Sequence, residues 1–275
     1  MRPNEYEQEQ IKAIKAWKAE EPSTISKIFG VVTVPVTWLM EKLIPQAAIR
    51  GVIDGANAVA GWLAYTDDIL RDANIRDANI LEIYELKRAN LELCDSLANQ
   101  VHNWAIGIAT VEGGVTGATG IFGLTADIPA IITWAFRTIH KIGLCYGFQP
   151  TSEMDNQFIL SILSASGANS VAEKSAALTM LKSVEITIAK QTWKAMAEKA
   201  AQQQLSKEGA IISVKNLAKQ LGINLTKRKA LQAIPAVGAL IGSSVNGWYI
   251  KDVGWAARRA FQKRWLIDNQ KIIDI

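Results

Sequence analysis

The sequence predicts an all-α protein, organised as a single multi-helix domain with two glycine-rich helical hairpins. Strand-like alternation of apolar and polar residues is rare, and Ala, Leu, Lys, Glu and Gln dominate outside the glycine-rich parts, which favours helices. Hydrophobic residues make up 49% of the 275 residues, so the chain can bury a sizeable core. The hairpins are predicted from two apolar segments with closely spaced glycines, residues 111–136 and 230–250.

The chain opens with a predicted amphipathic helix within residues 1–22, followed by the main helical domain over residues 23–275. Asn4 is placed to cap the first helix, which is expected to end before Pro22. The start of the chain lacks the basic and apolar regions of a signal peptide, and the two cysteines form no CxxC motif. These features predict a cytoplasmic protein whose cysteines are small buried residues.

The middle of the chain is predicted to hold three helices. Apolar residues at spacings of three and four predict a long helix that starts at about Leu81 and runs into the first glycine-rich segment. The polar stretch 149–156 is a candidate boundary between two sub-domains. Capping residues predict the next two helix starts, at Ser152 with Asp155 and at Ser170 with Glu173.

The first glycine-rich segment reads VEGGVTGATGIFGLTADIPAII from Val111 to Ile132. It allows three interpretations: a phosphate cradle, a close helix crossing or a segment that enters a membrane. The segment lacks the Gly-Lys pair of a P-loop, and its GxxGxxG spacing follows a helix rather than a strand, which argues against nucleotide binding. Gly113 and Gly117 share one helix face, where a second backbone can approach closely, so the pattern favours helix packing.

The end of this segment predicts a turn and a new helix. Asp127 followed by Pro129 is typical of a helix start, with the aspartate as the N-cap. Residues 108–147 are therefore predicted to form a helical hairpin whose turn lies at Gly123–Thr125.

The second glycine-rich segment, residues 230–250, contains no charged residue and is long enough for a helix that crosses a membrane. Pro235 and several polar residues interrupt it, and Gly238 and Gly242 repeat the spacing of small residues at helix contacts. A buried core hairpin, a membrane span and reversible lipid contact all stay open for this segment.

The C-terminal part of the chain is basic and predicts an anionic partner. Nine Lys or Arg residues and three Asp residues lie between Lys227 and the end. A basic helix that also carries tryptophans is expected to dock on anionic lipid. The predicted membrane surface comprises Trp248, Trp255, Arg258, Arg259, Lys263, Arg264 and Trp265.

Motifs for catalysis and metal binding give only weak candidates. His102 and His140 are the only histidines, and neither belongs to an HExxH motif, so no metal and no cofactor is expected. The GxSxG elbow of hydrolases is also absent. Asp127, His140 and Glu112 are the candidates if the protein is an enzyme. Glu112 and Asp127 could instead pair with each other, or with Arg137, as a structural charge cluster.

Residues 214–234 have some features of a helix-turn-helix, because Lys227, Arg228 and Lys229 could contact phosphates. Arg228 occupies a position that should be apolar, however, and Pro235 cuts the recognition helix short. Nucleic-acid binding is therefore a lesser alternative.

Two segments carry a resemblance to a known family: GGVTGATGIFGLTADIPAIITWAFRTIHKIGLCYGF (113–148) and IPAVGALIGSSVNGWYIKDVGWAARRAFQKRWL (234–266). The sequence resembles the EcsC family of bacterial proteins over most of the chain after about residue 20. The family is named after a protein encoded alongside an ABC transporter. The resemblance implies an all-helical domain and a link to membrane processes, and it implies no catalytic residues.

These observations predict a non-enzymatic protein at the cytoplasmic face of the membrane that binds anionic lipid, an apolar ligand or a membrane-protein partner. The alternatives are a hydrolase that acts on lipid or peptide near Asp127 and His140, and an interaction module that forms a homo-oligomer. The predicted ligand or lipid pocket comprises Gly113, Gly117, Gly120, Gly123, Asp127, Arg137, Gly238, Gly242 and Asn246.

Overall fold

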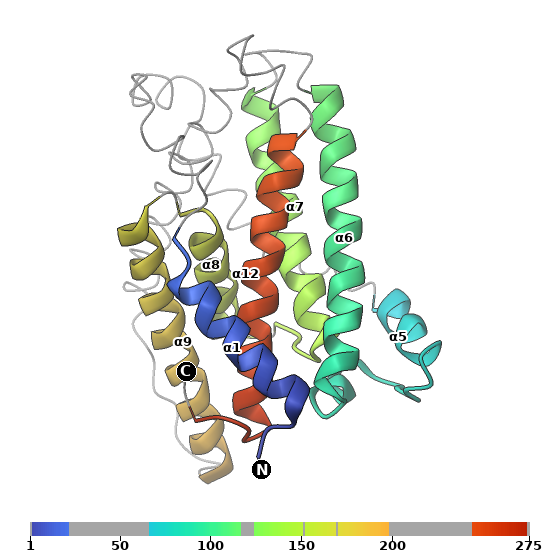
Figure 1. Ribbon diagram of the computed structural model, residues 1–275, viewed down its shortest axis with the longest axis vertical. Helices are drawn as coiled ribbons and strands as arrows, with labels where there is room; N and C mark the ends of the chain where they lie inside the picture. The colour runs from blue at the N-terminus through green and yellow to red at the C-terminus, as the bar shows by residue number, and fades with distance from the viewer. Residues whose placement is uncertain are drawn as a thin grey trace.

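The computed structural model describes six stretches of the chain: residues 2–21, 66–116, 124–150, 152–168, 170–197 and 244–273. Within these stretches the chain forms α-helices, one 3-10 helix and connecting loops, and no strand. The prediction of an all-α single domain is confirmed. The helices, labelled as in Figure 1, are α1 (Glu5–Ala19), α5 (Asp67–Asn74), the 3-10 helix η1 (Ile83–Lys87), α6 (Leu91–Thr116), α7 (Leu124–Cys145), α8 (Glu153–Ser166), α9 (Val171–Ala197) and α12 (Ser244–Asp268).

Helix α12 runs through the middle of the bundle, with α6 and α7 on one side and α8 and α9 on the other (Figure 1). Helix α1 crosses over its lower half. The ring of Phe261 lies in the core beside those of Tyr146, Phe148 and Phe158, at centroid distances of 5.3 to 6.3 Å. Such aromatic contacts bury large apolar areas. A helix that was predicted to lie on a membrane surface is therefore a central helix of the core.

Several helix starts agree with the sequence-based prediction because they depend on local hydrogen bonds. The Asn4 side chain accepts from the backbone N–H of Glu7 at 2.8 Å, and the Glu7 carboxylate accepts from the backbone N–H of Asn4 at 2.8 Å. Ser152 and Asp155 form the same reciprocal pair at the start of α8. These capping boxes satisfy backbone N–H groups that have no partner inside the helix.

Two predicted boundaries are wrong. The long helix begins at Leu91, not near Leu81, and the Leu81 side chain is 80% exposed. A 3-10 helix and a turn stand before α6, so the apolar spacing there does not mark a helix face. Helix α7 begins at Leu124, which places Asp127 inside its first turn rather than at the N-cap.

The hairpin prediction is tested only in part. Helices α6 and α7 pack against each other, but residues 117–123 and 230–243 lie outside the described residues. The predicted sub-domain boundary at 149–156 stays a prediction. Among the helices that the structure describes, none is both long and apolar enough to cross a membrane.

Two glycines of α12 allow this helix to approach α6 closely. The sequence had suggested such a contact for the glycines of residues 111–132. A Cβ atom on Gly247 would lie 2.2 Å from the Thr110 hydroxyl oxygen, and one on Gly254 would lie 2.1 Å from the His102 ring. Both partners belong to α6. Backbones that approach this closely leave no room for a side chain.

Replacing Gly254 with alanine is expected to lower the free energy of unfolding by about 1–3 kcal/mol, because the added methyl group overlaps the His102 ring. The measurement is urea denaturation followed by circular dichroism. Gly107 of α6 is a matched control, since a Cβ atom there has no neighbour within 4 Å. Gly107→Ala should leave stability unchanged or raise it by up to about 1 kcal/mol. Equal effects of the two changes would contradict the close contact.

Candidate functional site

The charged residues of α12 point mostly into the protein. Lys263 is 2% exposed, and its ammonium lies 2.5 Å from the Glu185 carboxylate of α9. Trp265 is 3% exposed, and Arg264 contacts Asp155 of α8 at 3.0 Å. The prediction that these residues form an exposed basic surface is therefore wrong. Their charges are neutralised by residues that are distant in sequence.

The arginines next to them are also engaged. Arg258 is buried and donates to the Asn99 side chain at 2.9 Å, whereas Arg259 donates to Gln10 at 3.0 Å and to Gln262 at 2.7 Å. Both guanidinium groups lie over the ring of Trp255, at 4.5 and 5.1 Å from its centroid. Burial lowers the pKa of the Arg259 guanidinium. These arginines hold α1, α6 and α12 together.

A buried carboxylate, Asp95 of α6, forms the polar centre of this region. It accepts hydrogen bonds from the Tyr6 hydroxyl at 2.7 Å, from the Gln262 amide at 2.7 Å and from the Tyr146 hydroxyl. Burial raises the pKa of both tyrosines, and the neighbouring Asp95 raises it further. The cluster joins α1 to α6, α12 and the turn after α7. It therefore sets the position of α1.

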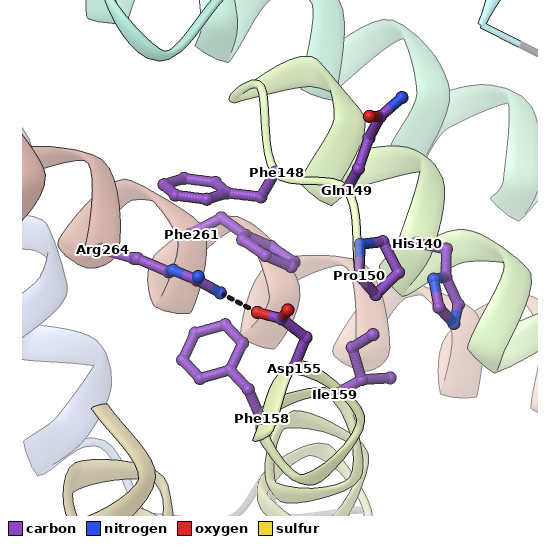
Figure 2. A pocket seen from close by; sticks show the side chains of 9 residues that line it. All are labelled: His140, Phe148, Gln149, Pro150, Asp155, Phe158, Ile159, Phe261 and Arg264. Atoms are coloured by element: carbon purple, nitrogen blue, oxygen red, sulfur yellow. Dashed lines mark hydrogen bonds and ion pairs between the residues drawn. The ribbon is translucent and has the colours of Figure 1, made fainter. Parts of the chain in front are cut away.

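His140 lines a small cavity next to the Arg264–Asp155 ion pair (Figure 2). The guanidinium of Arg264 lies between the rings of Phe148 and Phe158, at 4.4 and 5.2 Å from their centroids. The cavity measures about 10 Å³, which is room for about one water molecule. Burial lowers the pKa of His140 to about 4, so its ring is neutral at pH 7. The cavity is too small for a substrate.

The candidate catalytic residues are not brought together. Asp127 and His140 lie on the continuous helix α7, thirteen residues apart, which corresponds to about 20 Å along the axis. The side chains of Asp127 and Glu112 lie outside the described part of the chain. Residues 2–21, 66–116, 124–150, 152–168, 170–197 and 244–273 contain no group of three His, Cys, Asp or Glu side chains that could hold a metal ion.

The predicted glycine pocket is largely untested. Five of its members lie outside the described residues: Gly117, Gly120, Gly123, Gly238 and Gly242. Gly113 lies in α6. Asn246 is buried near the start of α12. Arg137 lies instead over the rings of Trp134 and Trp104, at 5.1 and 5.9 Å from their centroids.

A groove of about 840 Å³ lies where the end of α1 meets α12 and the region that joins α8 to α9. Pockets for small ligands measure roughly 300–1,000 Å³. Three tryptophans line the groove: Trp17 from α1, and Trp248 and Trp255 from α12. Alanines from all three walls also line it: Ala13, Ala16, Ala19, Ala165, Ala168 and Ala256. The lining thus combines indole rings with small apolar side chains.

Charged groups also line this groove. Lys174, Lys251 and Arg259 supply the cations, and Glu20, Glu21 and Asp252 supply the acids. Lys174 comes from the first turns of α9 and donates to the backbone carbonyls of Trp17 at 2.7 Å and Glu20 at 2.5 Å. These two hydrogen bonds hold the C-terminal end of α1 against the start of α9.

The sequence had singled out three residues of this groove, but as part of a membrane-binding surface. Trp248, Trp255 and Arg259 were assigned to a membrane surface, and they line the groove instead. Trp17 and Lys174 were missed because neither belongs to a motif. A tryptophan at helical spacing is typical of a core, and a lysine in a helix is typical of a solvated face. Only the packing of α1 on α12 and α9 brings them together.

The fold and the site define a class of protein: an all-α bundle around one buried helix, with a ligand-sized groove under an N-terminal helix. A model of the EcsC protein family matches residues 8–266. The chain belongs to the EcsC protein family. The resemblance noted in the sequence is confirmed.

One relative is a protein of Bacillus subtilis (strain 168) called uncharacterized protein YdbA. The chain is 25% identical to it over 194 residues, which is 69% of this chain and 66% of the relative. The chain therefore aligns with just under two thirds of that relative's length. No solved structure matches.

Proposed function

We propose that the protein is a non-enzymatic helical protein that binds an amphipathic ligand, an apolar chain with a polar end, in the groove between α1, α9 and α12. The observation that carries this proposal is the groove itself, with its three tryptophans, its alanine walls and its volume of about 840 Å³. Ligand pockets are mostly apolar, with a few polar groups that fix orientation. The groove has this composition.

The lining supports binding rather than catalysis. Among the described residues, the lining contains no histidine and no cysteine. Ser166 lies in this lining; it is buried and donates to the backbone carbonyl of Leu163 at 2.8 Å. A nucleophile needs an adjacent base to be activated, and the groove lining supplies no histidine for this role.

The test is titration with N-phenyl-naphthylamine, an uncharged probe whose fluorescence rises in apolar surroundings. We expect saturable binding that dodecanol displaces. Trp248→Ala should weaken binding about tenfold, because an indole contact worth on the order of 1.4 kcal/mol is lost. Trp104→Ala is the matched control, since Trp104 is 51% exposed and lies outside the groove. Absence of saturable binding, or equal losses in the two variants, would reject the proposal.

A second candidate function is contact with an anionic membrane surface at the cytoplasmic side, through the outer face of α6 and α7. On this face Trp104 and Trp134 lie 6.4 Å apart, with the Arg137 guanidinium over both rings. Residues 100–110 and 130–141 contain no acidic residue. Tryptophan beside arginine is typical of residues at the lipid interface.

Flotation with phosphatidylglycerol vesicles and phosphatidylcholine vesicles tests this second candidate. We expect binding to the anionic vesicles alone, and a several-fold lower bound fraction for the double change Trp104→Ala with Arg137→Gln. Ile186→Ala is the control, because Ile186 is an exposed apolar residue of α9 on the other side of the bundle. A bound fraction that the double change leaves intact would exclude this face.

A further inference from the structure

Lys174 gives the groove a chemical preference, and this inference rests on the proposed function. We infer that the groove takes an anionic single-chain amphiphile, whose carboxylate or phosphate head contacts Lys174 while its apolar chain lies along the tryptophans and alanines of α1 and α12.

The Lys174 ammonium lies at the wall of the groove, close to the end of α1. The residue is 9% exposed and lines the groove. An ammonium group has three N–H donors. Two of them go to the backbone carbonyls of Trp17 and Glu20, at 2.7 and 2.5 Å. Among the described residues no acceptor takes the third donor, and an oxyanion in the groove is the acceptor that a buried cation favours most.

Charged groups of both signs surround this lysine. Glu20 and Asp252 favour its charged form, yet burial outweighs them and lowers the pKa of Lys174. An anion beside the ammonium would oppose this effect of burial. Along the groove, Lys251 and Arg259 add positive charge and Glu21 adds negative charge, and the position of Lys174 near the start of α9 adds the positive end of a helix dipole beside the ammonium.

Cations of the protein on the groove's indoles disfavour a cationic head group. Aromatic rings can bind quaternary ammonium ions, but protein cations already occupy two of the three indoles. The Lys174 ammonium lies 5.3 Å from the centroid of Trp17, and both Arg258 and Arg259 lie over Trp255. A ligand cation would have to compete with these groups and would be repelled by them.

The experiment compares head groups on one chain length by isothermal titration calorimetry with the full chain, below the critical micelle concentrations. The ligands are dodecanoate, dodecyl phosphate, dodecanol and dodecyltrimethylammonium. We expect both anions to bind at least tenfold more tightly than dodecanol, and the cation to bind most weakly. The ratio of dodecanoate to dodecyl phosphate affinity distinguishes a carboxylate site from a phosphate site. Equal affinities for dodecanoate and dodecanol would overturn the inference and leave the proposed function intact, whereas no binding of any ligand would overturn both.

Variants then assign the preference to Lys174. Lys174→Met keeps the apolar stem and removes the ammonium, and we expect it to abolish the anion preference while dodecanol affinity stays within about twofold. Lys174→Arg should restore the preference, because it keeps the charge. Lys182→Met on the exposed side of α9 is the matched control and should behave as the wild type. An anion preference that survives Lys174→Met would overturn the role of this residue, and the head-group series on the wild type tests the ligand class even if that variant unfolds.

Discussion

Replacing Lys263 with methionine is expected to lower the free energy of unfolding by about 3–5 kcal/mol. The change removes the ammonium that lies 2.5 Å from the Glu185 carboxylate, which stays buried. Desolvation makes the loss of this cation costly, because neither side chain of the pair is accessible enough for water to replace its partner. Urea denaturation followed by circular dichroism measures the effect.

The double change Lys263→Met with Glu185→Leu is the control for this prediction. Replacing a buried ion pair by apolar residues of similar volume is often neutral or stabilising, so the double variant should recover most of the loss. A loss below about 0.5 kcal/mol for Lys263→Met would mean that the lysine is accessible to solvent, as the sequence had suggested. It would contradict the placement of α12 in the core.

Replacing Asp95 with alanine is expected to lower the free energy of unfolding by at least about 3 kcal/mol, because three donors, two of them fully buried, lose their acceptor at once. The donors are the hydroxyls of Tyr6 and Tyr146 and the amide of Gln262. Since Tyr6 belongs to α1, the change should also loosen this helix from the bundle. Hydrogen exchange of the α1 amides, measured with the unfolding curve, checks both effects.

Tyr6→Phe provides the matched control for Asp95→Ala. It removes one donor and leaves Asp95 with two, so we expect a loss of about 1 kcal/mol and a smaller rise in α1 exchange. If Asp95→Ala left α1 exchange unchanged, the cluster would not hold this helix. The groove wall that α1 supplies would then depend on other contacts, such as those of Lys174.

The helices were predictable from the sequence where local chemistry determines them. Asn4 with Glu7 and Ser152 with Asp155 are capping pairs three residues apart, and such pairs depend on nothing beyond one helical turn. The start of α6 was missed because Leu81 has a helical spacing but lies before a 3-10 helix and a turn.

The burial of α12 was not predictable from the sequence. Lys263 and Arg258 are typical of a solvated or lipid-facing helix, and only tertiary packing brings them to Glu185 of α9 and Asn99 of α6. The charges are buried because each finds a partner from another helix. A single sequence contains no local signal of such a pairing.

The groove was not predictable for the same reason. Its walls come from the end of α1, the region around Lys174 and the first half of α12, which are far apart in sequence. The sequence indicated the tryptophans of α12 but assigned them to the outside. Helix α1 lies across α12 (Figure 1). Its Trp17 lines the same groove as Trp248 and Trp255 of α12.

Photo-cross-linking with a diazirine-bearing dodecanoate, followed by peptide mass mapping, tests the groove most directly. Binding in the groove predicts saturable labels within residues 13–21, 165–174 and 248–259, and these labels should disappear when unlabelled dodecanoate is added in excess. Saturable labelling confined to residues 100–110 and 130–141, on the outer face of α6 and α7, would contradict binding in the groove and would place the ligand on the surface that carries Trp104.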